Sequence, residues 1–451
     1  MMRASNLSVK VKVGSVAATV LLSGTLVSLG GLSSAFQSSV RPAKTQKVIH
    51  LVYWNMWSGH WETLVKSMVA EFNRTHPLIQ VKTLAVPAAD GDAKLLTAIA
   101  AGNPPDVFTE WNSSIGSFAN NGSLVNLNQF MRGSEKKMRS WFYPIALKWA
   151  TYKGGLYGLP WTMNSDALFY NKTMMKRAGL NPNRPPKTLA QLNAEQAKLW
   201  KFSKNGAVQQ MGFYDGAFNT FAGTFGVKDF IKGKYDLLTP QAKADMKFLS
   251  TFKKYPFSKV SGFSSAFSAA AGGAEDPFDM GKAGFYVNGM WEIPQIQAND
   301  PRLQYGVAPL PAPPGGHYGA STINGNYNII PKNAKYPKAA WTFITWLSGY
   351  GNVAWAASHD PLGGWLPPSP KVANAPAYKK FIAASPNRAQ FVKALANPYD
   401  HISAVTPAEQ FYQTTMATEQ DDVLEGKVSP IAALKAVQQA ANKQLQQDVA
   451  P

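Results

Sequence analysis

Six tryptophans have sequence neighbours that place them on loops: Trp54, Trp57, Trp111, Trp161, Trp291 and Trp365. An indole ring offers a wide apolar face and one N–H donor, so several together can hold a flat, partly apolar molecule. A single tryptophan is explained about as well by a place in a hydrophobic core. The stretch VNGMWEIP (287–294) favours a binding role for Trp291, because a strand runs through Asn288 and Gly289 into the ring and glycine lets another group approach.

Neutral polar residues accompany these rings: Asn55, Ser58, Asn112, Ser113, Asn164, Asn324 and Asn326. Flat apolar faces combined with uncharged donors and acceptors suit a sugar, whose rings have a C–H face and a fringe of hydroxyls. Few fixed charges are available to hold a phosphate or the two ends of a free amino acid. The pattern therefore favours an uncharged, hydroxylated ligand.

Catalytic and metal-binding motifs are missing from the sequence. It contains no phosphate-binding loop, zincin helix or nucleophile elbow, and none of its 6 histidines has metal-ligand spacing to another. The lack of cysteine removes thiolate sites and disulfides. A glycosidase needs two carboxylates across a cleft, and the acidic residues near the loops are better explained as helix caps and rim charges: Glu110, Asp166, Glu275, Asp276 and Glu292. We therefore expect no enzymatic activity, no metal and no cofactor.

The first residues have the pattern of an export signal. Arg3, Lys10 and Lys12 precede an uncharged apolar stretch, and small residues before a cut after Ala35 predict a signal peptide over 1–35 and a linker over 36–47. The alternative is an uncleaved anchor, since 13–32 is about as long as a spanning helix needs. In either case the body of the protein is exported, and no cysteine is available for lipid attachment.

The net charge of +19 raises the question of a nucleic-acid partner. The lysines and arginines are scattered, however, and form no dense basic run with aromatic residues, so we expect no nucleic-acid binding. A solvated positive surface explains the charge and could retain the protein peripherally at an anionic wall or membrane. Scarce carboxylates and histidines also limit charge build-up as the pH falls, and we hypothesise an acidic habitat.

Hydrophobic patterning predicts an α/β unit at the start of the exported chain. Strands over 46–54, 78–86 and 105–111 alternate with helices over 60–77 and 92–102. This order implies right-handed crossovers and a largely parallel sheet. Ligands of such sheets lie beyond the carboxyl ends of the strands, where the sequence has WNMWSGHW and EWNSSIG.

A second unit follows. Residues 154–172 read as a strand that crosses into it, with Pro160 at the hinge, and helices are predicted over 188–203 and 239–254. Small residues over 264–276 predict a flexible stretch, and the Pro- and Gly-rich segment 305–332 a connection between lobes. Further helices are predicted over 336–349 and from Pro430, the latter with Ser429 as N-cap.

Four motifs in order resemble the extracellular solute-binding proteins of ABC sugar importers, the family that includes maltose-binding protein. They are AAGNPPDVF, LYGLPW with ALFYNKTMMKRAGL and PPKT, FDMGKAGFYVNGMW, and YGVAPLP with INGNYNIIPKNAKYPKAAWTFITWLSG. The resemblance covers nearly all of residues 48–445.

The resemblance implies an α/β periplasmic-binding-protein fold of two lobes, each a mainly parallel sheet flanked by helices and joined by crossing hinge segments. The N-terminal lobe would comprise 48–161 and 320–364, and the C-terminal lobe 162–319 and 365–451. It implies a monomer that closes on a carbohydrate between the lobes, catalyses no reaction and delivers the ligand to an ABC permease.

Carried over by motif, the resemblance predicts these ligand-binding residues: Asn55, Trp57, Ser58, Glu110, Trp111, Asn112, Ser113, Trp161, Asn164, Trp291, Asn326, Trp365 and Tyr412. Trp291 matches the family's stacking aromatic, and Tyr412 is a weaker match to a second one. Two departures argue against maltodextrin as ligand. The acidic residue after PDV is replaced by Asn112 or Ser113, with Glu110 displaced, and Trp57 and Ser58 stand where maltodextrin binders have charged groups.

Three other readings remain open from the sequence. A secreted glycan-processing enzyme would share the aromatic residues, and a wall-bound structural protein would explain the charge. A receptor of the same fold for a polyol, a phosphodiester or a peptide would share the architecture.

Overall fold

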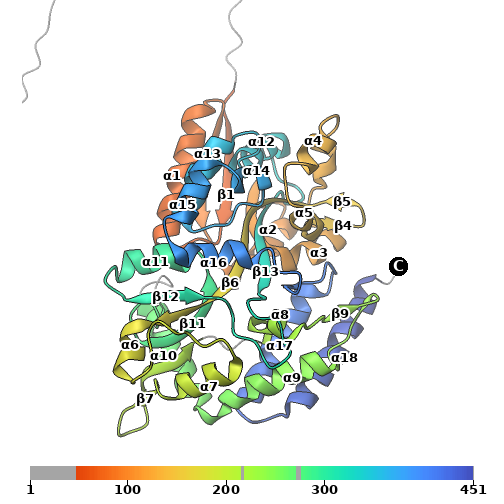
Figure 1. The fold of residues 1–451 in the computed structure, drawn as a ribbon. Coiled ribbons are helices and arrows are strands. Elements are labelled where there is room, and N and C mark those ends of the chain that lie inside the picture. The colour runs from red at the N-terminus through yellow and green to blue at the C-terminus, as the bar shows by residue number, and fades with distance from the viewer. Residues whose placement is uncertain (1–46, 215–217, 271–275, 450–451) are drawn as a thin grey trace, which may run out of the picture. The chain divides into compact units, whose positions relative to one another are not determined.

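The computed structural model describes residues 47–214, 218–270 and 276–449 (Figure 1). The predicted signal peptide, nearly all of the 36–47 linker and Glu275 lie outside the described residues. No helix within the described ranges has the length and apolar character needed to cross a membrane.

The predicted strand–helix alternation at the start of the chain is confirmed. Strands β1 (Ile49–Asn55), β2 (Ile79–Ala85) and β3 (Val107–Trp111) alternate with helices α1 (Gly59–Thr75) and α2 (Ala88–Ala100). Strand β1 pairs in parallel with both β2 and β3. Because α1 repeats its apolar residues at helical spacing, it buries one face, from Trp61 to Phe72.

In the part of the chain that the structure describes, ten strands form one sheet, in the order β2-β1-β3-β13-β6-β11-β8-β7, with β12 beside β6 and β14 beside β13. At its centre are β6 (Gly158–Asn171) and β13 (Thr322–Ile329), which lie side by side in Figure 1. Strand β6 pairs with β13 up to Ser165 and with β11 (Ala283–Gly289) from Asp166 onward. The long strand therefore links two groups of strands, and its partner changes a few residues beyond Pro160.

A third segment of chain lies along the same region. Met163 in β6 forms an isolated bridge with Leu366, and the N–H of Met163 donates to the Leu366 carbonyl at 2.7 Å. We call β6, β13 and residues 363–369 the three crossing segments. They bring residues from three distant parts of the sequence to one place.

The remaining elements of the described chain are the other strands of this sheet, two small two-stranded sheets and the remaining helices. They are α3 (Asn112–Asn120), α4 (Glu135–Arg139), α5 (Pro144–Trp149), β4 (Thr151–Tyr152), β5 (Gly155–Leu156), α6 (Lys172–Arg177), α7 (Leu189–Ala197), β7 (Lys201–Phe202), β8 (Val208–Tyr214), α8 (Ala222–Phe225), β9 (Phe230–Ile231), β10 (Lys234–Tyr235), α9 (Pro240–Leu249), α10 (Phe257–Ala270), α11 (Glu292–Asn299), β12 (Tyr305–Ala308), α12 (Pro337–Leu347), α13 (Val353–Gly363), α14 (Pro370–Ala373), α15 (Pro376–Ala383), α16 (Pro386–Ala394), β14 (His401–Ile402), α17 (Glu409–Leu424) and α18 (Pro430–Val449). Short 3-10 helices span Leu127–Phe130, Phe218–Thr220 and Ser250–Lys254.

Several sequence expectations need correction. The helix predicted over 188–203 ends at Ala197, because Lys201 and Phe202 pair with β8 instead. The stretch predicted to be flexible from residue 264 is helical as far as Ala270, in α10. The strand that contains Asn288 ends at Gly289, and Trp291 is the N-cap of α11. The Ser429 cap is confirmed, since its Oγ accepts from the N–H of Ala432 at 3.2 Å.

Candidate functional site

Three of the predicted tryptophans meet at the crossing segments. The rings of Trp57 and Trp365 lie 5.1 Å apart between centroids, those of Trp161 and Trp365 5.0 Å, and those of Trp57 and Trp161 6.0 Å. Trp57 follows β1, Trp161 is in β6 and Trp365 follows α13. We call these three residues, with Trp291 beside them, the tryptophan cluster.

Trp291 joins the cluster through the backbone of Gly364. A Cβ at Gly364 would lie 2.7 Å from the Cα of Trp291 and 2.7 Å from the Met290 carbonyl oxygen. Gly364 also has φ +68°, a backbone conformation that residues with a side chain rarely adopt. Glycine at this position therefore lets the third crossing segment contact the start of α11 directly.

The Gly364→Ala variant is expected to be destabilised by about 2 kcal/mol or more, since it combines an unfavourable φ with overlap against the Met290–Trp291 backbone. Gly351→Ala is the matched control, because Gly351 has φ +77° but open space where its Cβ would lie. Urea unfolding of both variants measures the difference. Equal loss of stability in the two would show that the contact with Trp291 contributes nothing.

Gly289 determines how the Trp291 ring lies at the end of β11. A Cβ on Gly289 would lie 1.8 Å from Cζ3 of Trp291, so the indole folds back over the glycine. The ring is half-buried and packs against the main core, but it is not enclosed by it. The Gly–Trp pair thus positions one indole face against the backbone at the end of β11.

Three indole N–H groups of the cluster, those of Trp57, Trp161 and Trp365, are buried and have no acceptor among the described residues. Trp161 and Trp365 are each 1% exposed. A buried donor without a partner costs about 1–3 kcal/mol. Trp141 and Trp149 also have unpartnered buried donors, but within the described ranges only this cluster brings several such donors together on rings in contact. Trp161 and Trp365 belong to the main hydrophobic core, so an acceptor from outside the chain reaches these donors only when the surrounding segments move apart.

Asparagines and a threonine line the strands beside the cluster. Asn326 of β13 lies between Trp111 of β3 and Thr162 of β6. The Thr162 hydroxyl donates to Asn326 Oδ1 at 2.9 Å. Two residues further along the same pair of strands, Asn164 Nδ2 donates to Asn324 Oδ1 at 2.8 Å. These residues are uncharged, as predicted for the surroundings of the site.

Asn55 shapes the loop that carries Trp57. Its Nδ2 donates to Thr83 Oγ1 at 2.7 Å and its Oδ1 accepts from the N–H of Trp57 at 3.0 Å. Asn55 is buried, and these bonds hold the loop after β1 in place. Ser58 is the N-cap of α1 but forms no side-chain cap bond.

The loop predicted after the third strand is not present: Glu110 and Trp111 belong to β3, and Asn112 and Ser113 are the first residues of α3. Glu110 is buried, and burial together with the neighbouring Asp92 charge raises its pKa well above the usual range. Asn112 Oδ1 accepts from the N–H of Gly325 at 3.1 Å, and Ser113 Oγ donates to Gln410 Oε1 at 2.9 Å. Trp111 is half-buried and is not part of the hydrophobic core clusters of the described chain.

Tyr412 lies in a different environment. Its ring stacks on that of Tyr235 at 4.7 Å, within the core formed by α9, α17 and α18. Nearby, His401 Nε2 and Asp229 Oδ2 are 3.0 Å apart and buried. Tyr412, Glu409 and His401 line a cavity of about 280 Å³ next to this pair. One face of the Tyr412 ring is thus covered by Tyr235.

Sequence reasoning missed Trp61, which supports the cluster. Its Nε1 donates to the carbonyl of Gly363 at 3.1 Å, and its ring lies 6.4 Å from that of Trp57. Trp61 follows Trp57 by four positions in the sequence, and this spacing was the available signal. The bond ties α1 to the third crossing segment.

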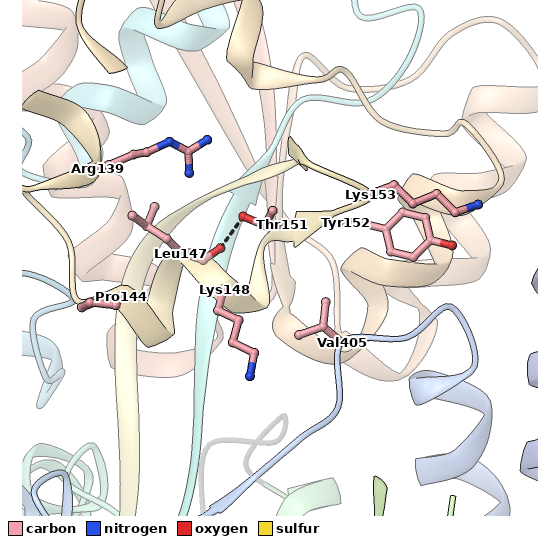
Figure 2. A pocket seen from close by; sticks show the side chains of 8 residues that line it. All are labelled: Arg139, Pro144, Leu147, Lys148, Thr151, Tyr152, Lys153 and Val405. Carbon is pink, nitrogen blue, oxygen red and sulfur yellow. Dashed lines mark hydrogen bonds between the residues drawn. The ribbon is translucent and has the colours of Figure 1, made fainter. Parts of the chain in front are cut away.

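Two other cavities contain none of the thirteen predicted ligand-binding residues. A cavity of about 650 Å³ between α5 and β4 is lined by Arg139, Lys148 and Lys153 among others, and Figure 2 shows their charged ends spread around it. A second, of about 510 Å³, is mainly apolar and includes Met163, Ile323 and Leu366 from the three crossing segments.

The fold and the site define a class of protein: a mixed α/β binding protein in which crossing segments carry aromatic residues. The sequence model of the family described as bacterial extracellular solute-binding proteins matches residues 67–388, which is more than half of the chain. The chain therefore belongs to the bacterial extracellular solute-binding proteins, and the resemblance seen in the sequence is confirmed.

Individual relatives have low sequence identity to this chain but align with most of its length. A maltotriose-binding protein of Pyrococcus abyssi is 26% identical over 334 residues, which cover 73% of this chain and 68% of that protein. The structure of a protein designated CpMnBP1 with mannotriose bound is similar with a TM-score of 0.77 and 29% identity over 87% of this chain and 100% of that one. The same protein with mannobiose bound gives a TM-score of 0.74 and 30% identity over 88% and 100%. These similarities confirm the predicted α/β fold class of two-lobed binding proteins.

Proposed function

We propose that this protein captures a carbohydrate, either a mono- or an oligosaccharide, and delivers it to the permease of an ABC transporter. The observation that carries the proposal is the tryptophan cluster, with three buried indole donors that lack a protein acceptor in the described chain. Sugar hydroxyls can accept these hydrogen bonds while the C–H faces of pyranose rings pack on the indoles. Relatives named for maltotriose, mannotriose and mannobiose support the same ligand class.

The charge distribution supports a neutral ligand. Asn164, Thr162 and Asn326 beside the cluster are uncharged. An anionic solute would need convergent arginines or lysines. The cationic cavity of Figure 2 is lined by other residues. A phosphodiester ligand is therefore disfavoured.

Binding would draw the two groups of strands together around the crossing segments. In this proposal residues 48–161 and 320–364 form one lobe, and 162–319 and 365–451 form the other. A ligand that touches both lobes stabilises their closed arrangement by its additional contacts there. The protein acts as a monomer and catalyses no reaction, so it releases the sugar unchanged to the permease.

A melting-temperature screen against mono- and oligosaccharides tests the proposal. We expect at least one sugar to raise the melting temperature in proportion to the logarithm of its concentration. The same sugar should change the intrinsic tryptophan fluorescence. Mannose, mannobiose, mannotriose, maltotriose and glycerol phosphate form an informative first panel. Release of new reducing ends from polysaccharide would instead favour an enzyme, and a flat response to every solute would favour a structural protein.

The family is extracellular, and the proposal includes export by a signal peptide cleaved after Ala35. With no cysteine in the chain, the mature protein would be free, attached through an uncleaved segment, or held peripherally by its positive surface. The intact mass of the exported protein distinguishes these forms.

A further inference from the structure

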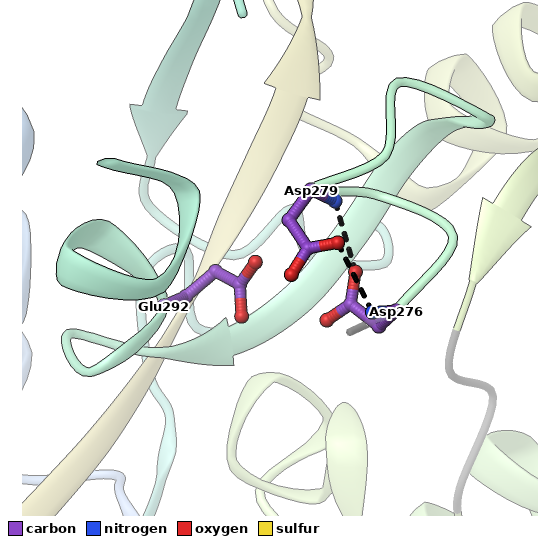
Figure 3. Close-up of side chains that lie close together, drawn as sticks. All are labelled: Asp276, Asp279 and Glu292. Atoms are coloured by element: carbon purple, nitrogen blue, oxygen red, sulfur yellow. Dashed lines mark hydrogen bonds between the residues drawn. The ribbon is translucent and has the colours of Figure 1, made fainter. Parts of the chain in front are cut away.

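Three buried acidic side chains meet beside Trp291. The carboxyl groups of Asp276, Asp279 and Glu292 each offer an oxygen within 4.8 Å of the others. Their side chains are 7%, 0% and 0% exposed, respectively. Figure 3 shows Asp276 and Asp279 on the loop before β11 and Glu292 at the start of α11, with the three groups turned toward one another. We call them the carboxylate cluster.

The loop backbone and neutral amides hold two of these side chains in place. Asp276 Oδ1 accepts from the N–H groups of Phe278 and Asp279, at 2.7 and 2.9 Å. Asp279 Oδ1 accepts from the N–H of Asp276 at 3.0 Å. Asp279 Oδ2 accepts from Gln295 Nε2 and Asn299 Nδ2, at 2.9 and 2.8 Å. The positions of the carboxylates are thus fixed by neutral donors.

Only one of the two carboxylate oxygens of Glu292 accepts a hydrogen bond from a described residue. Its Oε2 accepts from Asn288 Nδ2 at 2.9 Å, whereas its Oε1 is buried without a hydrogen-bond partner among the described residues. In Figure 3 the Glu292 carboxyl group points toward the two aspartates. A buried carboxylate oxygen without a donor is costly, and three such charges at this separation repel one another strongly.

Among the described residues, no basic side chain forms an ion pair with Asp276 or Glu292. Burial and the neighbouring carboxylates raise the pKa of Asp276 to about 7 and that of Glu292 well above its usual range. The cluster therefore needs bound positive charge, either protons or a cation.

We propose that the carboxylate cluster binds a divalent cation, with calcium preferred. Calcium takes oxygen ligands at about 2.3–2.6 Å in flexible geometry, and the three carboxyl groups lie close enough together to share one ion. Magnesium requires about 2.0–2.1 Å and retains several waters, which this buried position disfavours. The unpartnered Glu292 Oε1 becomes a ligand, and the repulsion between the three groups is removed.

The site lies where the ion would stabilise the loop that presents Trp291. Glu292 follows Trp291 directly, and Asn288, which donates to Glu292, precedes Gly289 under the indole. Calcium would link the 276–279 loop to the first residue of α11. Calcium binding itself does not depend on whether the solute is a carbohydrate, so the two proposals can be tested separately.

The test is calcium titration of the full exported chain after removal of metals with EDTA, at pH 7.5 and without sugar. We expect one binding site by calorimetry, with a dissociation constant of about 10⁻³ M or tighter. Calcium at about 10 mM should raise the melting temperature by about 2 °C or more, and EDTA should reverse the rise. Magnesium at the same concentration should produce a smaller shift.

Two variants separate the cluster from other acidic groups. Glu292→Gln should abolish the calcium-dependent shift, because it removes the ligand charge and places an amide at the site. Asp245→Asn is the matched control, since Asp245 in α9 is also buried with an unpartnered carboxylate oxygen, and its response to calcium should equal that of the wild type. Absence of any calcium binding by the wild-type chain, or a shift retained in Glu292→Gln, would overturn the proposal and leave protons as the balancing charge.

Discussion

Replacing Trp291 with alanine is expected to weaken carbohydrate binding by about 30-fold or more, which corresponds to about 2 kcal/mol. The ring is half-buried, folds over Gly289 and adjoins the cluster through Gly364. The substitution removes the indole face that Gly289 positions for stacking, and the methyl group of alanine cannot replace it. Calorimetry with the sugar that gives the largest melting shift measures the effect.

The matched control for this variant is Trp341→Ala. Trp341 is also half-buried, but it lies in α12 and stacks on Phe130, with ring centroids 5.5 Å apart. Its replacement should cost stability without changing the sugar affinity of the folded protein. Unchanged affinity in Trp291→Ala would refute the stacking role, whereas an equal loss in both variants would indicate a general effect on folding.

The second large effect concerns pH: the free energy of unfolding should be higher at pH 5 than at pH 8. Burial raises the pKa of Asp400 to about 7, and burial together with the charge of Asp229 raises that of Glu409 to about 8. Burial also raises the pKa values of Asp245 and Asp360 well above the usual range. These groups hold protons in the folded protein that the unfolded chain would release.

The sign follows from the direction of the shifts. Each of these carboxyl groups has a higher pKa in the folded than in the unfolded state, so its contribution to stability is complete below about pH 4 and is lost as the pH rises through the folded value. Glu409 alone should contribute about 4 kcal/mol to the change between pH 5 and pH 8, and the other groups add to it. Asp229 acts in the opposite direction: although burial works against ionisation, the paired His401 lowers its pKa, so its contribution declines only in stronger acid.

Urea unfolding at a series of pH values measures this profile. Glu409→Gln should flatten it, because the amide cannot titrate, while Glu135→Gln, at an exposed position, should leave it unchanged. Stability that collapses between pH 5 and pH 3 would contradict the acidic habitat hypothesised from composition, and a profile that rises toward pH 8 would contradict the assigned protonation of the buried groups.

The local elements could be predicted because their patterns are local. Alternating strands and amphipathic helices fixed the first five elements to within a few residues, and Ser429 was recognised as a cap from its neighbours. The strand through Asn288 was predicted to continue into Trp291, because the sequence does not reveal that the indole folds back on Gly289. That contact depends on the third crossing segment, which is distant in sequence.

The site was only partly predictable for the same reason. Trp57, Trp161 and Trp365 contact one another. Trp161 and Trp365 are buried in the main hydrophobic core, which is the alternative that the sequence leaves open for a single tryptophan. The contribution of Asn55 to loop geometry and the burial of Glu110 depend on neighbours from other strands, which periodicity does not identify. Whether the thirteen predicted residues bind a ligand stays a prediction, and the domain boundaries do as well.

The central position of β13 has a consequence for how the chain matures. This strand lies between β3 and β6, yet it follows β6 by about 150 residues in the sequence. The sheet cannot close until residue 329 has left the ribosome, and pairings of such long range form slowly. A nascent chain whose sheet is completed late stays unfolded for longer. A secretion channel accepts a chain in this unfolded state.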